Sequence, residues 1–301
     1  LMLAGLLMSG ALPHAFDAEG LLFAAGYVAM QLGRTLFMGW AVPSTRPDLR
    51  RNFQRVTVWL AVSSVLWIAG ALSSHDARVV LWTLAIAVEY LSPMVGFRVP
   101  GMGTSHTRDW DIDGGHVAER CSLFIMIALG ESILVTGATA AGTRATAAAD
   151  AAFVVAFLGS VAMWWIYFNI GAERGTRQIA SADDPGHIAR LAYTYLHLPI
   201  VAGIVVAAVA DELVLAHPGG HVELPFVAVT VGGPLLFLLG NLAFKRVLWR
   251  RAPLSHMAGT AMLCLAAALA PFASPLALAT LTTAILLVVA AWETVSLGRA
   301  R

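Results

Sequence analysis

The chain has 301 residues, of which 58% are hydrophobic and only 12% are charged, and its mean hydropathy is +0.75. Soluble domains carry about 25% charged residues, so this composition excludes an ordinary soluble domain and indicates an integral membrane protein. The formal net charge is +1, and no basic stripe accompanies a nucleic-acid-binding motif, so nucleic acid is not an expected partner. The two cysteines form no Cys-x-x-Cys pair, so neither a disulfide framework nor a zinc site is predicted.

Long apolar runs, separated by turn-forming residues, recur along the chain and predict membrane-spanning helices. We expect an all-α, polytopic bundle of about ten transmembrane helices, forming a single integral membrane domain over residues 1–301. The predicted helices cover residues 1–12, 20–41, 54–73, 78–97, 116–141, 151–170, 187–210, 222–244, 254–272 and 275–297. The first run is shorter than the roughly 20 residues of a span, so we expect it to be the remainder of a truncated helix.

Basic residues gather in every second predicted connection. The connections with two or more arginines or lysines are 42–53 with its helix edge, 98–115, 171–190, 245–253 and the C-terminal tail. The connections between them carry at most one basic residue. Because basic loops remain on the cytoplasmic side, this alternation predicts a multi-pass protein with a cytoplasmic C-terminus.

Glu131 lies in the apolar run 124–135, where a carboxylate costs roughly 2.5–3.5 kcal/mol on insertion scales and normally faces a protein interior or a wet cavity. His116, Arg120 and Glu131 share one helical stripe, but Arg120 and Glu131 are about 16 Å apart along the axis and cannot pair. The partner of Glu131 must therefore come from another helix or from water. The candidates are Arg34, Glu89, Tyr90, Asn169, Tyr193 and His197.

Two interpretations of these residues stay open. Arg34, Glu89, Arg120 and His197 fall in the cytoplasmic half of their predicted helices, which suggests a buried ion-pair network. Such a network can bind or move an ion or solute, since intramembrane ionisable residues are functional candidates by default. It can also serve packing specificity alone.

Metal and catalytic signatures are weak or missing. His116 and Glu119 have the i, i+3 spacing of metal ligands but supply only half a site, so no metal or other cofactor is predicted. Residues 109–114 imitate the start of a calcium loop, but Arg120 stands where the loop needs a bidentate glutamate, so helix capping is the preferred interpretation. Without a Gly-x-Ser-x-Gly, His-Glu-x-x-His or phosphate-binding motif, we do not expect an enzyme, although a lipid-modifying enzyme is a third alternative.

The fifth predicted helix contains the sequence HVAERCSLFIMIALGESI at residues 116–133. This segment resembles the hallmark of the bacterial low temperature requirement protein A family, and the runs QLGR at 31–34, EY at 89–90 and WWIYF at 164–168 extend the likeness. The family usually has an acidic, phenylalanine-rich helix at its start and an aspartate where Asn169 stands. The resemblance implies a polytopic protein of the bacterial inner membrane and leaves its biochemical activity undefined.

Our leading hypothesis is a transporter or permease-like protein with a buried polar site. Glu131 and Glu89 are its proposed titrating or ion-binding groups, with Arg34 and Arg120 as their charge partners. The alternative is a non-transporting stress-adaptation or assembly protein whose ion pairs only hold the bundle. Membrane lipid and an unknown small solute or ion are the expected partners, and self-association as a homo-oligomer is left open.

Overall fold

A computed structural model describes residues 1–106, 110, 114–142, 146–169, 190–249 and 252–298 of the chain. These residues form helices and short connections, with no β-strand among them. The chain divides into two compact units, Leu1–Asp111 and Ile112–Arg301, and each is described by itself. The expectation of a single domain stays a prediction.

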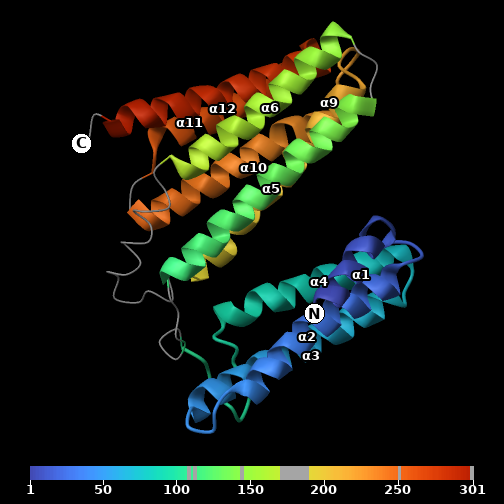
Figure 1. The fold of residues 1–301 in the computed structure, drawn as a ribbon, viewed down its shortest axis with the longest axis vertical. Coiled ribbons are helices and arrows are strands. Elements are labelled where there is room, and N and C mark those ends of the chain that lie inside the picture. Colours follow the sequence, from blue (N-terminus) through green and yellow to red (C-terminus); the bar gives the residue numbers. More distant parts are fainter. Residues whose placement is uncertain (107–109, 111–113, 143–145, 170–189, 250–251, 299–301) are drawn as a thin grey trace. The chain divides into compact units, whose positions relative to one another are not determined.

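The described residues of unit 1 form the helices α1 Met2–Ala11, α2 Gly20–Ala41, α3 Pro47–Ala71 and α4 His75–Met94 (Figure 1), with a 3-10 turn, Leu12–His14, after α1. Helix α2 packs against α1 and α3, and α3 packs against α4. Two tryptophans, Trp67 and Trp82, are buried at the centre with their ring centroids 5.2 Å apart. Trp82 lies in the first half of α4, and its ring belongs to this core.

A buried arginine ties the ends of these helices together. Arg78, on the first turn of α4, donates hydrogen bonds to the carbonyls of Ala15, Asp17, Gly70 and Ala71 at 2.8–3.3 Å. Each carbonyl belongs to a helix end or a turn, where backbone acceptors lack a helical donor. Arg78 is therefore a structural residue of the helix bundle.

Unit 2 contains the other long helices (Figure 1). They are α5 Gly114–Gly142, α6 Ala147–Phe168, α9 His197–Ala216, α10 Leu224–Trp249, α11 Leu254–Leu269 and α12 Pro275–Gly298. A π-helical turn, Arg190–Tyr195, leads into α9, and a 3-10 turn, Ala270–Phe272, follows α11. The closely packed pairs are α9 with α10 and with α5, α6 with α12, and α11 with both α10 and α12.

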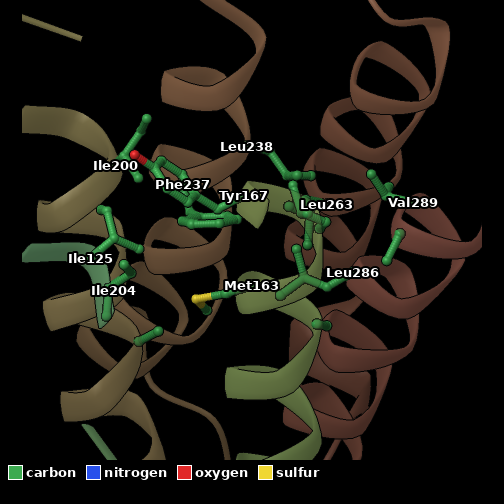
Figure 2. Close-up of a cluster of buried hydrophobic side chains, with 14 of the residues drawn as sticks. Ile125, Met163, Tyr167, Ile200, Ile204, Phe237, Leu238, Leu263, Leu286 and Val289 are labelled. Atoms are coloured by element: carbon green, nitrogen blue, oxygen red, sulfur yellow. The ribbon is translucent and has the colours of Figure 1, made fainter. Parts of the chain in front are cut away.

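Two glycines let α9 and α10 approach at backbone distance. A Cβ atom on Gly203 would lie 2.5 Å from the Phe237 backbone nitrogen, and one on Gly233 would lie 2.7 Å from the Ala207 nitrogen. Small residues permit this kind of packing between membrane helices. Beside this contact lies an apolar core shared by α5, α6, α9, α10, α11 and α12 (Figure 2).

The predicted fold class is confirmed. Nine helices in the described residues are long and apolar enough to cross a membrane, and a shorter apolar helix precedes them at Met2–His14. Two helix ends differ from the prediction at charged residues. Helix α9 continues to Ala216 rather than ending at 210, and α10 continues to Trp249 rather than 244. Asp211 and Lys245 therefore lie within helices and not in loops.

Candidate functional site

A carboxylate in the middle of unit 1 is held by neutral donors from two other helices. Glu89 of α4 accepts hydrogen bonds from the Tyr27 hydroxyl at 2.5 Å, the Ser63 hydroxyl at 2.8 Å and the Trp67 indole nitrogen at 3.0 Å. Tyr27 lies on α2, whereas Ser63 and Trp67 lie one turn apart on α3. In the described part of unit 1, no arginine, lysine or histidine forms an ion pair with Glu89. We call these four residues the Glu89 cluster.

A chain of side chains on α2 connects this cluster to the surface. Gln31 donates its amide to the Tyr27 hydroxyl at 3.1 Å, and Arg34 donates to the Gln31 amide oxygen at 3.0 Å. The spacings of four and three residues place all three on one helix face. Arg34 itself is exposed. The sequence suggested that Arg34 and Glu89 meet directly, whereas the structure joins them through Gln31 and Tyr27.

Unit 2 contains a buried ion pair that sequence reasoning missed. The Lys245 ammonium of α10 lies 2.7 and 2.8 Å from the two carboxylate oxygens of Glu293 on α12, and both side chains are at most 3% exposed. Lys245 also donates to the Ile166 carbonyl at 2.9 Å and lies 3.3 Å from His256 Nε2. We call these four residues the Lys245 cluster.

The ion pair had a signal in the sequence. Glu293 interrupts an apolar run just as Glu131 does, and this property alone could have nominated it. Lys245 had been counted as a cytoplasmic loop cation, because a charge near the end of an apolar run resembles a helix boundary. Its acceptors come from α6, α11 and α12, and these tertiary contacts leave no trace in the local pattern.

The predicted residues of α5 lie on exposed faces of unit 2. His116, Glu119, Arg120 and Glu131 are all exposed. Glu131 forms no hydrogen bond or ion pair with the described residues of its unit. The predicted network that joins Arg120 and Glu131 to residues of unit 1 stays a prediction, as does the buried location of Glu131.

The remaining candidates of unit 2 have partners other than Glu131. Asn169 donates its amide to the Thr294 hydroxyl at 2.6 Å. His197 Nδ1 lies 2.9 Å from the Ala192 carbonyl, and its Nε2 lies 2.8 Å from the Tyr167 hydroxyl. Since a carbonyl only accepts, Nδ1 carries the proton, and Nε2 of the neutral ring accepts from Tyr167.

The tyrosine next to this histidine is packed in the same aromatic cluster. The ring of Tyr193 stacks on His197 with their centroids 5.1 Å apart. Its buried hydroxyl has no hydrogen-bond partner among the described residues. Among those residues, no three His, Cys, Asp or Glu side chains gather in a way that could hold a metal ion.

Comparisons with known proteins agree with the resemblance of the fifth helix. A family model described as bacterial low temperature requirement A protein (LtrA) matches residues 1–291 of the chain. An uncharacterized protein of Rhizobium meliloti strain 1021 is 44% identical over 301 residues, which span the whole of this chain and 74% of the relative. No solved structure matches the chain.

Proposed function

Because this chain belongs to the bacterial low temperature requirement A family and is a multi-pass membrane protein, we propose that it moves a small ion or polar solute across the inner membrane. The observation that supports this proposal is the Glu89 carboxylate, which sits among apolar helices with three neutral donors. The proposal keeps the C-terminus in the cytoplasm and assigns no chemical reaction to the chain.

Neutral donors solvate a carboxylate without cancelling its charge. Glu89 is half-buried. A carboxylate withdrawn from water into a membrane is unfavourable unless it is paired, protonated or bound to an ion. In the described part of unit 1 no cation contacts Glu89, and the proposal gives this place to a proton or a ligand that arrives and leaves. Exchange of that partner is the elementary step of a transporter.

The polar side chains on α2 support an approach to this carboxylate. Tyr27, Gln31 and Arg34 form a continuous hydrogen-bonded series from Glu89 to an exposed position. Such a series lowers the barrier for a proton or a hydrated ion, because polar groups replace water along the path. Glu131 and Arg120 remain further candidate groups of the transport site, on the exposed faces of α5.

The test is a flux measurement on the purified protein in liposomes. Proton, sodium and potassium gradients are imposed in turn, and entry is followed with a pH dye or radioactive tracers. We expect at least one flux above that of empty liposomes and its loss in Glu89→Gln. The control is Glu212→Gln, which removes an exposed carboxylate from α9. A parent flux that survives in Glu89→Gln would remove Glu89 from the mechanism.

The Lys245 cluster favours a second candidate function. Its ammonium has acceptors for all three N–H groups and is almost fully buried, as expected of an ion pair that only holds helices together. A stress-adaptation or assembly protein built on such pairs would move no ion or solute. Its variants would lose thermal stability in detergent, while the parent protein would give no flux in liposomes.

A further inference from the structure

A small cavity inside unit 2 is lined by oxygen-bearing side chains that the proposed function does not use. It lies among α6, α9, α10 and α12 and has space for a water-sized group. The polar lining residues are Asp211, Thr230, Thr282 and Thr283. The rest of the lining is apolar or glycine, which leaves these oxygens as the groups that a ligand would meet.

Two of these side chains have an oxygen that forms no hydrogen bond with the described residues. Asp211 is partly buried, and its carboxylate accepts no hydrogen bond from the residues that the structure describes. Thr230 is 3% exposed, and its hydroxyl has no partner in the same part of the chain. A buried hydroxyl without a partner is costly, so Thr230 requires something in the cavity to contact it. The partly buried Asp211 lines the same cavity.

A proline in α10 removes the usual helical donor of a backbone carbonyl near the cavity. Pro234 has no N–H and cannot donate the helical hydrogen bond to the Thr230 carbonyl one turn earlier. Next to Pro234, the contact of Gly233 with Ala207 brings α9 and α10 to backbone distance. Asp211 follows Ala207 by one helical turn, so the close packing fixes the carboxylate beside the proline-interrupted turn.

We propose that this cavity binds a small monovalent cation, with sodium as the representative ion. Hydroxyl, carbonyl and carboxylate oxygens are the ligands that hard cations prefer. One carboxylate balances one positive charge, whereas a divalent ion would need further acidic ligands. The inference concerns binding alone and does not depend on transport through the Glu89 cluster.

Among the residues that the structure describes, no charged side chain besides Asp211 lines the cavity. The Lys245 ammonium faces Glu293, which is eleven residues beyond Thr282 on α12 and therefore about 16 Å away along the helix axis. Apolar side chains such as Phe237 and Leu286 fill the core between these levels (Figure 2). Glu212, the neighbour of Asp211, is exposed and does not line the cavity.

The experiment measures binding of radioactive sodium to the purified full chain in detergent, with choline chloride keeping the ionic strength constant. We expect saturable binding by the parent protein, competition by lithium stronger than by potassium, and a loss of more than about tenfold in affinity in Asp211→Asn. Thr230→Val, which keeps the shape of the side chain, should weaken binding by a smaller factor. Glu212→Gln is the matched control and should bind like the parent.

Thermal unfolding of the same proteins provides a second readout. A ligand that binds only the folded state raises Tm as its concentration increases. Sodium should therefore raise the Tm of the parent and of Glu212→Gln, but not that of Asp211→Asn, while Asp211→Asn still elutes as a folded protein in size exclusion. Absence of saturable binding by the parent, or equal sodium binding by Asp211→Asn, would overturn the proposal whatever the flux experiment gives.

Discussion

At the scale of single residues, the two polar clusters differ in how their charge is compensated. Glu293 has the Lys245 ammonium within 2.8 Å on both oxygens, whereas Glu89 has only neutral donors. The first arrangement pairs a cation with a carboxylate, and the second surrounds a carboxylate with neutral groups. This difference is the basis for proposing a structural role for the Lys245 cluster and ion transport for the Glu89 cluster.

The closed pair makes a prediction about stability. Glu293→Gln leaves the Lys245 ammonium buried without its counter-charge, and we expect a loss of about 3–5 kcal/mol in the free energy of unfolding. Removing both charges in Lys245→Met with Glu293→Leu should recover most of that loss, because no unpaired charge remains. Thermal unfolding in detergent is the measurement. A double variant less stable than Glu293→Gln would contradict this assignment.

At the scale of helices, the sequence predicted well which long helices exist and in what order they follow one another. It predicted less well the residues at which they end. Apolar runs located all the long helices, and α2 has the predicted bounds, Gly20–Ala41. The ends of α9 and α10 were placed too early, because Asp211 and Lys245 resembled loop residues. The residues that surround Asp211 and Lys245 belong to other helices, and the local sequence pattern holds no information about those helices. Glu89 was predicted as a site residue, but its donors Ser63 and Trp67 required the packing of α3 on α4.

The glycine contact between α9 and α10 gives a prediction at this scale. In Gly203→Val the new side chain would meet the backbone of Phe237, so we expect destabilisation of about 1–3 kcal/mol or more. Gly130→Val is the matched control, since a Cβ on this glycine of α5 meets nothing within 4 Å. Thermal unfolding of both variants measures the difference. Equal stability of the two variants would refute a close contact at Gly203.

At the scale of the whole molecule, two arginines near the connections are buried parts of the helix bundle. Arg78 is buried in α4 and bound to backbone carbonyls, so the connection between α3 and α4 has no free arginine. Arg55, at the helix edge of the basic connection before α3, is likewise buried and donates to the Met102 carbonyl. Each of the two connections therefore loses one arginine, and the asymmetry between them remains. This asymmetry is the basis for the proposed cytoplasmic C-terminus.

Reporter fusions test this orientation. A fluorescent protein that matures only in the cytoplasm should be bright when fused after Arg301, and alkaline phosphatase should be active when fused in the turn at Gly219. The reverse pair of fusions, phosphatase at the C-terminus and the fluorescent protein at Gly219, should both be inactive. An active C-terminal phosphatase would invert the proposed orientation.

The most direct test of the account compares ion flux in Glu89→Gln and Glu89→Asp at equal amounts of reconstituted protein. If the charge on Glu89 carries transport, Asp retains a measurable part of the parent rate and Gln reduces it to the level of empty liposomes, while both variants stay folded. A parent rate that persists in full in Glu89→Gln would contradict the account.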